Sequence, residues 1–199
     1  CGRDFRWYRV PMLLRRLRRR MGLSSVPDVD SYIALLRESE DELRALVKDF
    51  LISVTEFFRQ DDAWKFLEEQ VLPGLIEERL AAGGNLRVWT PGCATGEESY
   101  SIAMLLLEQL GQRSREATLN VFASDVDTDA LNFARAGSYP EAIVAEIGPQ
   151  RLARFFEKQG DRYVVRKALR ESVVFSPQDL VRDPPFSKLD LIVCRNVLI

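Results

Sequence analysis

Apolar residues in the first 58 positions recur every three or four residues, the spacing of amphipathic helices. The predicted elements are a helix over 12–21 ended by Gly22, a second helix capped by Asp30 or Ser31, and a third helix over 41–52. Residues 1–58 are therefore expected to form a small all-helical domain.

A helical linking segment is predicted over 59–84. Asp61 or Asp62 is expected to cap its helix, Pro73-Gly74 to interrupt it, and Gly83-Gly84 to close it.

From residue 85 the pattern changes to short apolar runs that alternate with helical periods. The predicted strands cover 86–90, 119–124, 163–165, 173–176 and 189–194, and the predicted helices cover 97–110, 128–135 and 151–158. Such alternation predicts an α/β fold, in which a mainly parallel sheet is covered on both faces. The apolar run into Ile199 and the missing initiator Met indicate that both ends lie inside a longer protein.

The amino-acid composition excludes several kinds of active site. The chain contains no histidine, which excludes a Ser-His-Asp triad, Cys-His catalysis and His-ligated zinc within it, and no metal site is expected. Its three cysteines, Cys1, Cys93 and Cys194, are odd in number and widely spaced, as suits a reducing cytoplasm. No apolar run approaches the roughly 20 residues of a membrane span. The net charge of −2 does not favour binding of the chain as a whole to nucleic acid.

A glycine loop, residues 91–96, joins a predicted strand to a predicted helix that opens with Glu97 and Glu98. Doubly wound folds bind nucleotides at such a loop, because glycines let a ligand approach the backbone. Two carboxylates would repel a phosphate, so a cationic ligand without phosphate, such as S-adenosylmethionine, fits better. The alternative is that both acids only stabilise the helix dipole, which is worth about 0.3–1 kcal/mol.

The second predicted strand ends at Asp125, where an acid can accept hydrogen bonds from ribose hydroxyls. The alternative reading of Asp125 and Asp127 is helix N-capping, which suits Asp127 or Thr128 better.

Five segments in chain order together resemble the CheR-type chemotaxis receptor methyltransferases, including versions fused to other signalling domains. The segments are LLRRLRRRM at 13–21, VTEFFR at 54–59, VWTPGCATGEE at 88–98, ASDVDT at 123–128 and DLIVCRNVLI at 190–199. The resemblance implies a Rossmann-like domain that uses S-adenosylmethionine to form glutamate methyl esters on the cytoplasmic helices of chemoreceptors. It also implies further strands and a small β-subdomain beyond Ile199, so the cofactor domain, residues 85–199, is expected to be incomplete.

The resemblance also implies site residues. Arg59 and Asn196 are expected at the methyl-transfer centre, Glu97 at the cofactor's ammonium, Asp125 at its ribose, and Asp179-Leu180 at its adenine. The full cofactor-binding set is Ser53, Thr55, Arg59, Gly92, Cys93, Ala94, Glu97, Asp125, Asp179, Leu180, Asn196 and Val197. The family often has Asn at the position of Ser53.

Residues 1–20 hold eight arginines and one acid. The resemblance implies that four of them dock the protein substrate: Arg15, Arg16, Arg18 and Arg19. Two alternatives are contact with RNA or membrane phosphates and a merely solvated helix face.

Two other functions stay open, a non-catalytic sensor or scaffold that binds the cofactor or its product, and a methyltransferase for another protein carboxylate or a small molecule. Self-association through the open edge of the strand at 189–194 is also expected.

Overall fold

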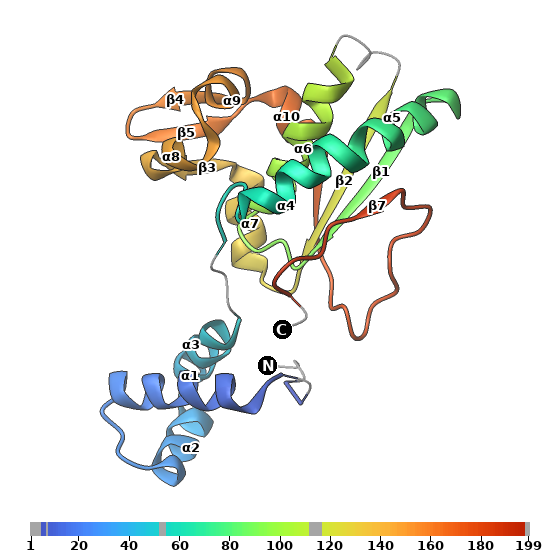
Figure 1. The fold of residues 1–199 in the computed structure, drawn as a ribbon. Coiled ribbons are helices and arrows are strands. Elements are labelled where there is room, and N and C mark those ends of the chain that lie inside the picture. The colour runs from blue at the N-terminus through green and yellow to red at the C-terminus, as the bar shows by residue number, and fades with distance from the viewer. Residues whose placement is uncertain (1–4, 7, 52–54, 112–116, 198–199) are drawn as a thin grey trace. The chain divides into compact units, whose positions relative to one another are not determined.

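The computed structural model describes residues 5–6, 8–51, 55–111 and 117–197, and its contacts divide the chain into two compact units, residues 1–52 and 53–198 (Figure 1). Each unit has its own hydrophobic core. None of the helices in these described ranges is long and apolar enough to cross a membrane.

The N-terminal unit is all-helical, as predicted. It consists of α1 (Val10–Leu23), α2 (Val29–Glu38) and α3 (Glu40–Phe50), which pack around Met21, Tyr32 and Leu46. Two boundaries were predicted wrongly. Gly22 lies inside α1 instead of ending it. The cap of α2 is Asp28, whose carboxylate accepts the backbone N–H of Ser31 at 2.9 Å, so neither Asp30 nor Ser31 is the cap.

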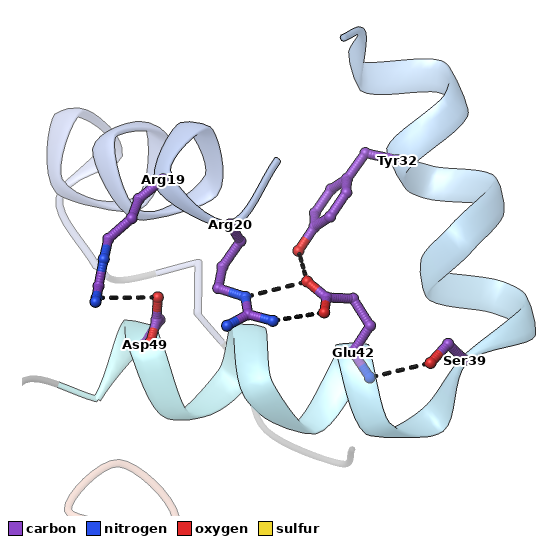
Figure 2. Close-up of polar contacts among 6 residues, drawn as sticks. All are labelled: Arg19, Arg20, Tyr32, Ser39, Glu42 and Asp49. Atoms are coloured by element: carbon purple, nitrogen blue, oxygen red, sulfur yellow. Dashed lines mark hydrogen bonds and ion pairs between the residues drawn. The ribbon is translucent and has the colours of Figure 1, made fainter. Parts of the chain in front are cut away.

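A half-buried polar network connects the three helices (Figure 2). Arg20 of α1 donates from Nε and Nη2 to the two carboxylate oxygens of Glu42 on α3, and the hydroxyl of Tyr32 on α2 donates to Glu42 at 2.6 Å. The hydrogen bonds from Arg20 lower the pKa of Glu42 to about 2. Burial raises the pKa of Tyr32 to about 12. Arg20 therefore holds the helices together and is not part of an exposed basic face.

Replacing Glu42 with glutamine is expected to lower the free energy of unfolding of the helical unit by about 1–3 kcal/mol at pH 7, because a half-buried charged partner of Arg20 is lost. The folded pKa lies below the ordinary value of 4.5, so this contribution is present above pH 4.5 and is lost as the pH falls toward about 2. Hydrogen exchange of the amides of α1–α3 in the whole chain measures it. Glu40→Gln, which removes an exposed pair with Arg44, should change exchange little.

The C-terminal unit is built on a parallel sheet, which confirms the predicted fold class. The strands are β1 (Asn85–Pro91), β2 (Thr118–Asp125), β6 (Val173–Pro177) and β7 (Leu191–Ile192), in the order β6-β2-β1-β7. The main helices between them are α6 (Glu97–Leu110), α7 (Thr128–Ala136) and α10 (Lys167–Glu171). The strand predicted over 189–194 is only two residues long and stands at the edge of the described sheet, with Ile192 exposed.

The linking segment continues without the predicted interruption. It consists of α4 (Asp61–Phe66), a five-residue π-helical turn, η1 (Leu67–Val71), and α5 (Leu72–Ala81). Pro73 cannot donate a backbone hydrogen bond, and the wider π turn directly before it accommodates that loss without ending the helix. The residue before α4 is Gln60 in a left-handed conformation, with no side-chain cap, so neither Asp61 nor Asp62 is the cap.

The chain between α7 and α10 forms a second, antiparallel sheet (Figure 1). It pairs β3 (Ser138–Pro140), β5 (Arg162–Val165) and β4 (Phe156–Gln159), and η3 (Glu141–Ile143), α8 (Val144–Ile147) and α9 (Pro149–Phe155) connect β3 to β4. The helix predicted over 151–158 is therefore wrong from residue 156 onward. Of the three strands of this sheet only β5 was predicted, so β3, β4 and the antiparallel pairing are findings of the structure.

Candidate functional site

The carboxyl ends of three parallel strands meet at the glycine loop. The backbone N–H of Cys93, after β1, donates to the carbonyl of Ser124 in β2 at 3.0 Å. The N–H of Ala94 donates to the carboxylate of Asp125 at 2.8 Å, and the N–H of Gln178, after β6, donates to the carbonyl of Asp125 at 3.0 Å. The loop, Asp125 and the segment after β6 thus form one edge of the sheet.

Gly92 brings the segment after β7 to the same edge. Its φ is +67°, and a Cβ atom there would lie 2.5 Å from Cγ2 of Val197. Only glycine lets the backbone turn here while the Val197 side chain packs against it. Asn196, the preceding residue, is exposed and also has a positive φ, +57°.

Glu97 is the first residue of α6, and its side chain is buried. The hydroxyl of Thr95 lies 2.9 and 2.7 Å from its two carboxylate oxygens, and the buried Tyr139 of β3 donates to the carbonyl of Thr95 at 2.7 Å. Burial raises the pKa of Glu97, and nearby Glu146 raises it further. Within the described part of the chain, no basic side chain forms an ion pair with Glu97. This uncompensated buried carboxylate suits a cationic ligand.

Asp125 braces the glycine loop. One carboxylate oxygen accepts the N–H of Ala94, and the other accepts the N–H of Asp127 at 2.8 Å. Each oxygen keeps a further acceptor position, as a carboxylate has about four. Asp127 is the N-cap of α7 and accepts from Asp129 and Ala130, so the capping alternative holds for Asp127 and not for Asp125.

The segment 55–60 is bound to the first turn of α6. The N–H of Phe58 donates to the hydroxyl of Ser101 at 3.1 Å, and that hydroxyl donates to the carbonyl of Glu97 at 2.7 Å. The N–H of Phe57 donates to Glu146 at 2.9 Å. Arg59 is therefore held close to α6, and Thr55 lies half-buried four residues before it. Ser53 lies outside the described residues.

Glu98, next to Glu97, faces two arginines. Burial raises its pKa to about 7, although the charges of Arg195 and Arg59 act in the opposite direction. Arg195 lies 3.9 Å from the Glu98 carboxylate, and its guanidinium stacks on Trp64 at 5.2 Å from the ring centroid. Neither Glu98 nor Arg195 belongs to the predicted site. Both lie in sequence segments that carry the family resemblance, 88–98 and 190–199, so the sequence could have indicated them as site residues.

Three further predicted site residues, Asp179, Leu180 and Cys93, lie in two different places. Asp179 follows Gln178, accepts the N–H of Val181 and lies beside Leu180, which is partly exposed. The predicted adenine contacts, Asp179 and Leu180, therefore directly follow Gln178, the residue that hydrogen-bonds to Asp125 at the carboxyl ends of the strands. Cys93 is buried, and burial raises the pKa of its thiol, so this thiol is a poor nucleophile.

The described residues contain no group of side chains suited to a metal ion. An open depression of about 580 Å³ lies beside the segment 56–62, Ala145 and Glu146, and the glycine loop does not line it.

The predicted docking residues lie on α1 in the N-terminal unit. Arg15, Arg18 and Arg19 are exposed, and Arg16 is partly buried. Arg19 forms an ion pair with Asp49 at 3.3 Å (Figure 2). The exposed basic face is therefore real, although one of its charges is partly neutralised.

Comparison with known families decides the assignment. Residues 53–199 match the model of the CheR methyltransferase SAM-binding domain, and residues 1–51 match the CheR methyltransferase all-alpha domain. The chain belongs to the CheR methyltransferase family. Its cofactor is accordingly S-adenosylmethionine, as the sequence predicted.

Three relatives show how the CheR chain compares in length. An uncharacterised 104.1 kDa protein of Rhodobacter capsulatus is 42% identical over 196 residues, which are 98% of this chain and 20% of that protein. The chemotaxis protein methyltransferase of Listeria monocytogenes is 32% identical over 198 residues and is covered to 73%. That of Escherichia coli is 34% identical over 199 residues and is covered to 65%. The chain thus spans a fifth of the first relative and about two thirds to three quarters of the others.

Proposed function

We propose that the protein containing this chain is an S-adenosylmethionine-dependent protein-glutamate O-methyltransferase of chemotaxis signalling. The buried Glu97 carboxylate is the observation that carries the proposal. A cation is the ligand that would compensate this charge, and the ammonium of the cofactor's methionine part is one. The relatives of Listeria monocytogenes and Escherichia coli are named chemotaxis protein methyltransferases, which favours an enzyme over a non-catalytic sensor.

The other proposed site residues contact the remaining parts of the cofactor and the methyl-transfer centre. Gly92, Cys93 and Ala94 offer backbone to the cofactor, Asp125 offers acceptor positions to the ribose, and Asp179-Leu180 lies at the adenine end. Asn196 and Val197 line the methyl-transfer side with Arg59. Thr55 and Ser53 complete the proposed set from the segment that precedes Arg59.

The reaction needs little proton chemistry. When bound, S-adenosylmethionine supplies a methyl group on a positively charged sulfur. A glutamate substrate has an ordinary pKa near 4.3 and is ionised at neutral pH, so no general base is required. This agrees with a chain that has no histidine. In this proposal Arg59 contacts the carboxylate of the cofactor's methionine part and also orients the incoming glutamate. Alignment of the reacting oxygen, carbon and sulfur by the whole site can contribute about 7–11 kcal/mol.

Two measurements test the proposal. Isothermal titration of the chain with S-adenosylhomocysteine reports cofactor-site binding, and transfer of a radiolabelled methyl group to chemoreceptor fragments by the full-length protein reports turnover. We expect both. Binding without transfer to any receptor fragment or other protein carboxylate would instead support a sensor.

The substrate is proposed to be the cytoplasmic helices of chemoreceptors, which places the protein in the cytoplasm. The exposed arginines of α1 suit acidic helical surfaces. Reversing Arg15, Arg16, Arg18 and Arg19 to glutamate should reduce receptor methylation at low salt about tenfold or more, because attraction becomes repulsion. S-adenosylhomocysteine affinity should stay within twofold.

Reversal of one acidic residue away from α1 is the control for a change of charge elsewhere on the chain. Glu157 lies on the exposed part of β4, and Glu157→Lys changes charge on the C-terminal unit without altering α1. If the α1 variant methylates receptor fragments as fast as the unmutated protein at low salt, the docking role is wrong.

We also propose that the isolated chain self-associates through its parallel sheet and transfers methyl groups poorly. β7 is an edge strand of the described sheet, and Ile192 on β7 and Val174 on β6 are about half exposed. Apolar edges of this kind pair with other strands. Light scattering over a concentration series should show a rising mean mass, and a C-terminally extended chain should be more monomeric and more active. A constant monomer mass would contradict the proposal.

A further inference from the structure

The turn that carries Arg59 is strained. Phe58 and Gln60, the residues on either side, have φ values of +51° and +63°, in the left-handed region that non-glycine residues rarely adopt. Such a conformation persists only where surrounding contacts hold it, and it is found mostly at functional sites.

Arg195 contacts two residues of the turn. Its Nη2 atom donates to the carbonyl of Arg59 at 2.6 Å and lies 2.7 Å from the side-chain oxygen of Gln60. Trp64 donates to the same Arg59 carbonyl at 3.0 Å, and its ring supports the Arg195 guanidinium. One nitrogen of Arg195 is thus committed to two consecutive residues of the turn.

The other edge of the guanidinium faces α6. The Nη1 atom is buried, has no hydrogen-bond partner among the residues described, and lies 3.9 Å from the Glu98 carboxylate. That separation allows attraction between the charges without a hydrogen bond. Arg195 therefore links the segment after β7, the turn at 58–60 and the first turn of α6, where Glu97 stands.

We propose that Arg195 is a positioning residue that locks the strained turn at 58–60 and thereby sets where Arg59 stands in the cofactor site. The inference rests on the proposed role of Arg59 at that site. Arginine is required because its planar fork can serve the turn on one edge and Glu98 on the other, whereas a lysine ammonium is a point charge on a flexible stem.

A double-mutant cycle tests this coupling, with S-adenosylhomocysteine as the titrated probe and the whole chain as the protein. We expect Arg195→Lys to weaken binding about tenfold in the unmutated chain and no more than about twofold when Arg59 is already glutamine, because residues of one network are not additive. Arg195→Lys should also speed hydrogen exchange at the amides of 57–60.

Arg87→Lys is the matched control. Arg87 also stacks on an aromatic ring, Phe122 at 4.5 Å, and donates to a backbone carbonyl, that of Ser187, but it lies on β1 near the amino end of the sheet. It should leave affinity within twofold. If Arg195→Lys does not fold, Gln60→Asn enters the same cycle, since the shorter amide tolerates the left-handed turn and withdraws from Arg195.

The outcomes separate this inference from the proposed function. Additive losses from Arg195→Lys and Arg59→Gln would overturn the positioning role while leaving the cofactor site intact. Full affinity in Arg59→Gln alone would overturn both the role of Arg59 and the positioning role. An unmutated chain that binds no S-adenosylhomocysteine would overturn the proposed function itself.

Discussion

Replacing Gly92 with alanine is expected to lower the free energy of unfolding of the C-terminal unit by about 2–5 kcal/mol. Two costs add. The positive φ of +67° disfavours any residue with a Cβ by roughly 1–2 kcal/mol. The added methyl would also lie 2.5 Å from a Val197 methyl group, and such overpacking costs about 1–3 kcal/mol. Urea unfolding followed by the fluorescence of the chain's tryptophans measures the sum.

Two further variants assign the cause. Val197→Ala combined with Gly92→Ala removes both close methyl groups and should restore the overpacking part, while the backbone part remains. Gly74→Ala serves as the control, because Gly74 lies within α5 with open space around it, and alanine there should stabilise the chain by about 0.5–1 kcal/mol. Equal losses in the single and double variants would refute the contact with Val197.

Local patterns predicted the cofactor end of the C-terminal unit well. The helix predicted over 97–110 has those bounds in the structure, because the glycine loop and the apolar period that define it are consecutive in sequence. The parallel sheet followed from alternating strands and helices for the same reason. Within this region, sequence order and spatial order coincide.

Long-range contacts could not be predicted in the same way. Residues 156–158 continue a helical pattern but form β4, because pairing with β5 across the turn at Gly160 outweighs local propensity. Likewise, Arg195 hydrogen-bonds to Arg59, which lies 136 residues away in the sequence, and Tyr139 hydrogen-bonds to Thr95, which lies 44 residues away. The sequence around each residue does not indicate which distant residue it contacts, so these pairs emerged only from the fold.

Replacing Glu97 with glutamine is expected to weaken S-adenosylhomocysteine binding by about 1–3 kcal/mol, or roughly 5- to 150-fold, because a charged hydrogen bond to the ligand's ammonium is lost. Glutamine keeps the shape and can still accept from Thr95. Glu108→Gln is the control on the same helix, since Glu108 pairs with Arg151 near the far end of α6. Titration calorimetry at pH 8 gives both affinities.

The pH dependence identifies the group. Burial raises the pKa of Glu97 above its ordinary 4.5, and only the ionised form attracts an ammonium. The affinity for S-adenosylhomocysteine should therefore be highest where Glu97 is ionised. As the pH is lowered, it should begin to fall at a higher pH than it would for a glutamate with an ordinary pKa. Glu98, whose pKa lies at about 7, titrates nearby, and Glu146 also faces Glu97. Glu98→Gln should remove the component near pH 7 and Glu97→Gln the remainder. An unchanged pH profile in Glu97→Gln would mean that this carboxylate does not bind the ligand.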